Sequence, residues 1–297
     1  MSWDGVVRLR ESTLAALAAK HGGRVVAGAA STVERLTPVG AAKAGDLAPL
    51  FAARFARDAR AALDRGAALL VDAAHASLVP GGRAPAVWVH DHATWAMAEL
   101  LDEALVPDAP AVIGPGCSIA PTAILGPRVV VGARVTIGPG AVIGHPGFGW
   151  AFGAAGAVRP VPQLGGVVLE DDVSIGPLCT IDAGTLAPTR IRAGAKLDAH
   201  IHVGHNGDIG AGTIIAAQSG FAGSVTVGRG VLVGGQVGVG DHVTIGDGAR
   251  IAGGSGVIGD VPPGAVVAGY PAVPRGRWLR AFATLYRGAR RPSSERS

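Results

Sequence analysis

The chain has 297 residues, enough for two domains and a sizeable hydrophobic core. Hydrophobic residues make up 48% of it, but aromatic residues only 4% and charged residues 16%, a balance typical of a solenoid rich in Val, Ile, Ala and Gly. No apolar run approaches the roughly 18 residues of a membrane-spanning helix. The first residues also lack the basic and apolar segments of a secretory signal, so we expect a cytoplasmic protein without a transmembrane segment.

Residues 1–107 have the pattern of a small α/β domain. Ser12 is placed to cap a helix over residues 14–20, and Gly22 and Gly23 would end it. Residues 67–71 and 86–89 predict short buried strands, and residues 94–105 predict a second helix. The proline-bearing segment 106–110 then forms a hinge.

Residues 108–270 carry a repeat in which every sixth residue is apolar, the signature of hexapeptide β-helices. Three hexapeptides form one triangular coil, so residues 18 apart are expected to stack at roughly the 4.8 Å spacing of neighbouring strands. The period breaks at residues 147–166 and again at 183–189, and such loops tend to carry function. The repeat positions are Ile113, Ile119, Leu125, Val131, Ile137, Ile143, Leu169, Ile175, Ile181, Ile191, Leu197, Val203, Ile209, Ile215, Phe221, Val227, Val233, Val239, Ile245, Ile251 and Val257.

The last segment, residues 271–297, predicts a basic amphipathic helix followed by a polar tail. Arginines at helical spacing alternate there with Trp278, Leu279, Phe282, Leu285 and Tyr286. Such a helix either caps the solenoid or provides a landing surface for an acidic partner, such as an acyl carrier protein or an anionic membrane. Nucleic acid is not expected, because the aromatic residues lie on an apolar stripe.

Histidines stand out against the apolar background of the second repeat block. His205 and Gly223 are 18 residues apart, which predicts that they lie on adjacent coils. His242 is two coils and one residue beyond His205, so we expect it on the same face at roughly 10 Å. A general base, a backbone N–H donor and a second polar group in one row favour acyl transfer.

Several motifs resemble the UDP-3-O-acylglucosamine N-acyltransferase family of lipid A, and hence lipopolysaccharide, biosynthesis. They are the segments at residues 196–206, 221–224, 147–151 and 240–242, followed by 262–264 and 270–272. The resemblance implies a left-handed parallel β-helix assembled as a homotrimer. It also implies transfer of a 3-hydroxyacyl chain from acyl carrier protein to the 2-amino group of the UDP-linked sugar, with no metal and no cofactor besides the carrier thioester.

The same resemblance implies catalytic roles for three residues. His205 would take a proton from the attacking amine, because a neutral imidazole titrates near working pH. The Gly223 N–H would stabilise the oxyanion, and His242 would assist at the sugar or its phosphates.

Substrate binding is assigned by resemblance to Asp198, Asn206, Phe148 and Phe55. Asp198 and Asn206 would orient the donor, and family sites lie between neighbouring subunits. The family holds uracil between two aromatic rings, but here the first ring is replaced by Pro49 and only Phe55 remains. Acyl transfer is therefore indicated more strongly than uridine recognition.

Three alternatives keep the fold and change the chemistry. A sugar-nucleotide O- or N-acetyltransferase using acetyl-coenzyme A would prefer short acyl donors. The spacing of His200 and His205 is similar to that of two zinc ligands in γ-class carbonic anhydrases, but the third ligand that zinc needs is not found upstream. A catalytically inactive paralogue is the last alternative, because the departures from the family pattern gather on the substrate side.

Overall fold

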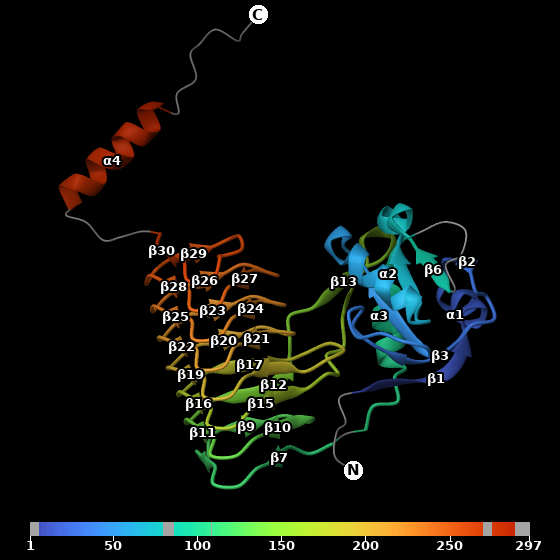
Figure 1. The fold of residues 1–297 in the computed structure, drawn as a ribbon, viewed down its shortest axis with the longest axis horizontal. Helices are drawn as coiled ribbons and strands as arrows, with labels where there is room; N and C mark the ends of the chain where they lie inside the picture. Colours follow the sequence, from blue (N-terminus) through green and yellow to red (C-terminus); the bar gives the residue numbers. More distant parts are fainter. Residues whose placement is uncertain (1–5, 80–85, 108, 270–274, 289–297) are drawn as a thin grey trace, which may run out of the picture.

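The structure is a computed structural model that describes residues 6–79, 86–107, 109–269 and 275–288. An N-terminal α/β domain lies beside a three-sided β-helix, and a helix follows the last coil (Figure 1).

The N-terminal domain is built on a six-stranded sheet in the order β1-β3-β4-β5-β6-β2. The four central strands run parallel, and β1 and β2 pair antiparallel at the two edges. The strands are β1 (Val7–Thr13), β2 (Arg24–Ala27), β3 (Thr32–Leu36), β4 (Asp46–Leu50), β5 (Ala68–Asp72) and β6 (Val87–His90). Strands β5 and β6 are almost wholly buried, which explains their continuous apolar sequences.

Three α-helices and two short 3-10 helices accompany this sheet. The α-helices are α1 (Leu14–His21), α2 (Ala56–Asp64) and α3 (Ala93–Asp102), and the 3-10 helices are η1 (Ala53–Phe55) and η2 (Ala73–Leu78). The predicted cap of α1 was wrong by one residue: the Thr13 hydroxyl, not that of Ser12, accepts from the Ala16 N–H at 3.2 Å. Ser12 instead donates to the Arg10 carbonyl.

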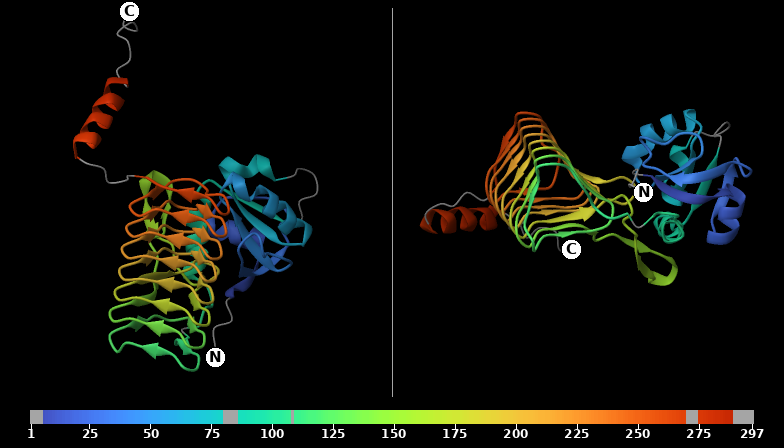
Figure 2. Two further views of the ribbon diagram at one scale, coloured as in Figure 1. Left: turned by 60° about the vertical axis from the view of Figure 1, so that its left-hand side comes forward. Right: turned by 90° about the horizontal axis from the view of Figure 1, so that it is seen from below.

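The β-helix has three walls of short parallel strands (Figure 2). The first wall contains β7 (Val112–Ile113), β10 (Val129–Val131), β15 (Val167–Leu169), β18 (Thr189–Ile191), β21 (Asp208–Ile209), β24 (Thr226–Val227) and β27 (Thr244–Ile245). The second contains β8 (Ser118–Ile119), β11 (Thr136–Ile137), β16 (Ser174–Ile175), β19 (Lys196–Leu197), β22 (Ile214–Ile215), β25 (Leu232–Val233), β28 (Arg250–Ile251) and β30 (Val266–Val267). The third contains β9 (Ile124–Leu125), β12 (Val142–Pro146), β17 (Thr180–Ala183), β20 (His202–Val203), β23 (Gly220–Phe221), β26 (Gly238–Val239) and β29 (Gly256–Val257).

Apolar repeat positions fill the interior of the prism from Val129 to Val261. The predicted 18-residue register is observed, since His202 pairs with Gly220 and Gly220 with Gly238. The predicted fold class is confirmed: a mainly β, left-handed parallel β-helix with a small N-terminal α/β domain and a C-terminal helix.

A few hydroxyl groups replace apolar side chains in this interior and satisfy buried backbone groups. Thr213 is fully buried, and its Oγ1 donates to the Gly228 carbonyl at 2.8 Å and accepts from the Val231 N–H at 3.2 Å. Replacing Thr213 by Val keeps the shape but leaves both backbone groups unpaired. We expect Thr213→Val to lower the free energy of unfolding by about 2 kcal/mol or more in chemical denaturation. Thr226→Val, at an exposed site in β24, is the control, and an equal loss there would contradict the explanation.

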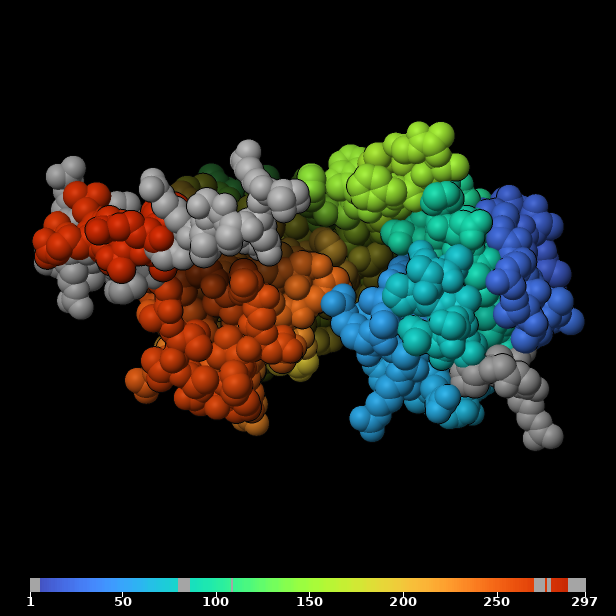
Figure 3. Space-filling view, turned by 90° about the horizontal axis from the view of Figure 1, so that it is seen from above, coloured from blue at the N-terminus to red at the C-terminus, as the bar shows by residue number. Residues whose placement is uncertain are grey.

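Two segments leave the regular coil, and both contact the N-terminal domain. The insertion (residues 147–166) connects β12 to β15 and contains a hairpin of β13 (Trp150–Phe152) and β14 (Val158–Pro160), with η3 (Ala154–Gly156) between them. Its Arg159 forms ion pairs with Glu99 and Asp102 of α3. The slip loop (residues 184–188) connects β17 to β18 and buries Leu186 in the core of the N-terminal domain. Figure 3 shows the insertion lying against that domain.

The last described element is α4 (Arg275–Gly288), where the sequence predicts a basic helix. Its Leu279, Leu285 and Tyr286 side chains are exposed. Among the described residues, no helix combines the length and apolar character needed to cross a membrane.

Candidate active site

His205 lies at the corner where the third wall turns into the first, directly after β20. Two glycines enclose its imidazole. A Cβ atom at Gly147 would lie 2.6 Å from the His205 Cβ, and one at Gly223 would lie 2.8 Å from Nε2. Only residues without a side chain fit on either side of the ring. The start of the insertion and the next coil therefore fix the position of this histidine.

His242 shares this corner, as the coil arithmetic predicts. The Ser224 N–H donates to the His205 carbonyl at 2.8 Å, and the His242 N–H donates to the Gly223 carbonyl at 3.0 Å. Asn206, Ser224 and His242 thus form one column, each with a φ near +60°. His242 Nδ1 is hydrogen-bonded to the carboxylate of the preceding Asp241.

A buried carboxylate faces this group of histidines. Asp182, at the end of β17, is 7% exposed, and burial raises the pKa of its carboxyl, opposed by His202, His145 and His205. His202 Nε2 lies 3.8 Å from Asp182 Oδ2, while His202 Nδ1 is hydrogen-bonded to the Thr180 hydroxyl at 2.8 Å. Asp182 is not among the site residues predicted from the sequence, because no repeat signal marks its burial.

Burial also sets the protonation of His205. It lowers the pKa of the imidazole below its usual value, and His242 and His202 act in the same direction. Asp182 and Asp241 oppose this effect. The ring is therefore neutral at neutral pH and carries one free electron pair, as a general base requires.

Asn206 lies on the Nδ1 side of the His205 ring. Its Nδ2 is 2.9 Å from His205 Nδ1, and its Oδ1 accepts from the Thr185 N–H at 2.7 Å. The Thr185 hydroxyl in turn donates to Gln163 at 2.7 Å. Asn206 is predicted from the sequence, but Thr185 and Gln163 are not. They lie in the slip loop and the insertion, whose positions in space the repeat does not predict.

The remaining predicted site residues lie on other segments of the chain and have no hydrogen bond to His205 among the described residues. Asp198 follows β19, at the corner between the second and third walls, and its Oδ1 accepts from the Ala199 N–H at 2.8 Å. Phe148 is 84% exposed on the insertion, and its ring packs edge-on against Trp150 at a centroid distance of 5.9 Å. Phe55 is half-buried in the N-terminal domain, with the Arg54 guanidinium over its ring.

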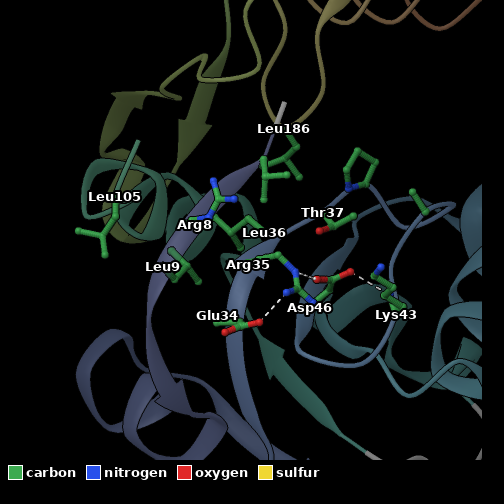
Figure 4. Close-up of a pocket in the computed structure, with 13 residues that line it drawn as sticks. Arg8, Leu9, Glu34, Arg35, Leu36, Thr37, Lys43, Asp46, Leu105 and Leu186 are labelled. Carbon is green, nitrogen blue, oxygen red and sulfur yellow. Dashed lines mark hydrogen bonds and ion pairs between the residues drawn. The ribbon is translucent and has the colours of Figure 1, made fainter. Parts of the chain in front are cut away.

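A pocket of about 480 Å³ lies where β1 and β3 meet the slip loop. Leu186 points into it from the β-helix side (Figure 4). Arg35 on its wall is bonded to both Glu34 and Asp46, and Asp46 also accepts from the Lys43 N–H at 2.9 Å. Because these charges satisfy one another, we place the candidate site at the β-helix corner.

No group of three or more His, Cys, Asp or Glu side chains that could hold a metal ion occurs in the part of the chain that the structure describes.

Known proteins resemble parts of this chain in sequence. Residues 110–145 match the family model described as "Bacterial transferase hexapeptide (six repeats)". A UDP-3-O-acylglucosamine N-acyltransferase from Methylobacterium nodulans is 40% identical over 151 residues, which is 51% of this chain and 43% of that protein. The enzyme of that name from Caulobacter vibrioides strain NA1000 is 54% identical over 149 residues, which is 50% of this chain and 44% of that protein.

The chain spans less than half the length of these two relatives. Among solved structures, LpxA from Acinetobacter baumannii is 24% identical with a TM-score of 0.48, and the match covers 58% of this chain and 66% of that chain. The resemblance to UDP-3-O-acylglucosamine N-acyltransferases that the sequence motifs indicate is confirmed over the matching half of this chain.

Proposed function

We propose that this protein is an acyltransferase that moves a 3-hydroxyacyl chain from acyl carrier protein to the 2-amino group of UDP-3-O-acylglucosamine. The observation that carries the proposal is a neutral histidine enclosed by two glycines at a corner of the β-helix. The whole reaction would run in the cytoplasm, without a metal or cofactor other than the carrier thioester.

The β-helix corner around His205 provides a chemical group for each step of this reaction. The amine attacks the thioester carbon, a C–N bond forms, and His205 takes the proton that the nitrogen loses. Among the described residues the Gly223 N–H has no hydrogen-bond acceptor, so it is available for the oxyanion. The C–S bond then breaks, and the carrier thiolate receives the proton from His205.

The other predicted residues fit supporting roles. His242, two coils from His205, is placed to contact the sugar or its phosphates, and Phe148 and Phe55 are proposed for substrate binding. Asp198 lies at a different corner from His205, so it would reach that histidine only across an interface. We therefore propose a homotrimer in which Asp198 of one subunit orients the donor at the site of its neighbour.

The proposal is tested by measuring acyl transfer to UDP-3-O-acylglucosamine from 3-hydroxyacyl carrier protein, with acetyl-coenzyme A as a competing donor. Turnover with the long-chain carrier donor supports the proposal. Preference for acetyl-coenzyme A would instead identify a sugar-nucleotide acetyltransferase. No turnover with a folded protein would indicate a different acceptor or an inactive paralogue.

The pH dependence follows from the lowered pKa of His205. As pH falls through that pKa, the ring becomes protonated and loses its free electron pair, so kcat/KM should fall along an acidic limb below about pH 6.5. Asp182 favours the protonated ring, so Asp182→Asn should move this limb to still lower pH. An acidic limb above 6.5 in the parent protein, or one that moves upward in the variant, would contradict the assignment.

A further inference from the structure

The orientation of the Asn206 amide is fixed by a backbone group. The Thr185 N–H can only donate, and it lies 2.7 Å from Asn206 Oδ1. The oxygen of this amide therefore faces the slip loop, and its NH₂ group faces His205. The assignment does not depend on the histidine at all.

A second chain of hydrogen bonds leads to the same result. Gln163 is buried, and its Nε2 donates to the Val161 carbonyl at 2.9 Å, so its Oε1 accepts from the Thr185 hydroxyl at 2.7 Å. Thr185 Oγ1 then accepts from Asn206 Nδ2 at 3.1 Å. These hydrogen bonds end on two backbone groups, the Val161 carbonyl and the Thr185 N–H. Backbone groups cannot exchange donor and acceptor roles.

One hydrogen of Asn206 Nδ2 remains, and it determines the tautomer of the histidine. Nδ2 lies 2.9 Å from His205 Nδ1, so Nδ1 accepts this hydrogen bond. A neutral imidazole whose Nδ1 accepts carries its own hydrogen on Nε2. Nε2 is the atom beside Gly223, so the ring presents a donor, and not an electron pair, to that side.

We propose that Asn206 is a positioning residue that holds the neutral His205 ring as its Nε2–H tautomer, with Thr185 and Gln163 fixing the amide. The proposal deepens the proposed function and rests on it for the role of His205. For Nε2 to take the proton of an amine, the ring must first lose the Nε2 hydrogen and gain one at Nδ1. The Asn206 amide must then turn so that its oxygen faces Nδ1, which breaks the Oδ1 and Nδ2 hydrogen bonds of the amide to Thr185.

The N-terminal domain holds the hydrogen-bonded residues Thr185 and Gln163 in place. Leu186, next to Thr185, is buried in the core of that domain, and Leu164, next to Gln163, packs against the same core. The Leu164 N–H donates to the Thr185 carbonyl at 3.1 Å and ties the two segments together. Both interruptions of the repeat thus meet behind His205, and a movement of the N-terminal domain would act on the amide through them.

Four other titratable groups act on His205, and they affect its charge. Asp182 and Asp241 favour the protonated ring, whereas His202 and His242 disfavour it. The only hydrogen bond to His205 Nδ1 among the described residues comes from Asn206. The tautomer of the neutral ring is therefore assigned to Asn206 and not to these charges.

The test is ¹⁵N NMR of the full-length protein labelled in its histidine rings, with the His205 signals identified by their loss in His205→Gln. The proposal expects a protonated Nε2 and an unprotonated Nδ1 in the neutral ring. Asn206→Asp keeps the acceptor for the Thr185 N–H and replaces the donor facing His205 by an oxygen. It should move the hydrogen to Nδ1 and raise the His205 pKa by roughly 1 to 3.

Thr185→Val and Thr185→Ser form a matched pair that spares Asn206. The valine variant keeps the backbone N–H but removes the hydroxyl, so the amide is held less firmly and the His205 signals should shift part of the way toward a mixture of tautomers, whereas the serine variant should keep the parent spectrum. A parent ring protonated at Nδ1, or an unchanged tautomer in Asn206→Asp, would overturn the proposal. The spectra need no turnover, so this result is independent of whether the proposed acyl transfer is observed.

Discussion

Replacement of His205 by Ala should lower the rate of acyl transfer by about 10²- to 10⁴-fold, the usual contribution of a positioned general base. The imidazole is neutral and is held between Gly147 and Gly223, so no other group can take its place at the same position. The side chain lies at a half-buried corner outside the apolar interior, so its loss should leave the β-helix folded. Steady-state kinetics with saturating donor and acceptor would measure the loss as a fall in kcat.

His200→Asn is the matched control. His200 is exposed at the corner between the second and third walls and has a φ of 58°, a conformation that Asn tolerates well. If His205 acts as a base, this variant should keep nearly full activity. A zinc site built on the His200 and His205 spacing would instead require both residues. Equal losses in the two variants, restored by added zinc, would contradict the role of His205 as a base.

From Val129 on, the periodic part of the molecule could be predicted from the sequence to the level of single residues. One apolar residue every six positions fixes which side chains point inward, and the 18-residue coil then places Gly223 beside His205. Even the extra residue in the spacing to His242 has a meaning, because it places that histidine in the column of Asn206 and not in that of His205. A repeat allows residue positions to be predicted in this way because each coil contacts only its neighbours.

The interruptions of the repeat could not be predicted in this way. Gln163 and Thr185 lie in segments without a period, and their meeting with Asn206 depends on how the insertion and the slip loop pack against the N-terminal domain. Asp182 is likewise buried outside the regular register, where β17 pairs with His145 of β12 after a register shift. Tertiary contacts of this kind leave no local signal in one sequence.

Local choices between neighbouring residues were also beyond the sequence. Ser12 and Thr13 are both suited to cap α1, and the structure selects Thr13 because β1 extends through residue 13 before the helix begins. Asp198 illustrates a different limit of prediction from the sequence. Its distance from His205 along the chain is short, yet the two lie at different corners of the prism, and any joint role requires a second copy of the chain.

Replacement of Gly223 by Ala should also lower kcat, by about 10²-fold or more, although the histidine remains in place in the sequence. The new Cβ would lie 2.7 Å from His205 Cε1 and 2.8 Å from Nε2, closer than real Cβ contacts allow, so the ring must move. A displacement of about 1 Å from the reacting geometry is enough for a loss of this size. The Gly223 N–H is still present in this variant, so the loss would measure the position of the imidazole.

Gly220→Ala is the control that separates this effect from a general effect of alanine substitution in the coil. Gly220 lies three residues earlier, in β23, and a Cβ there would have no atom within 4 Å. The φ of Gly223 is outside the left-handed region, so alanine suits its backbone and the fold should survive in both variants. Full activity in Gly223→Ala would show that the ring does not need its close contact with the next coil. The reaction would then have to take place on the opposite side of His205, where Gly147 begins the insertion.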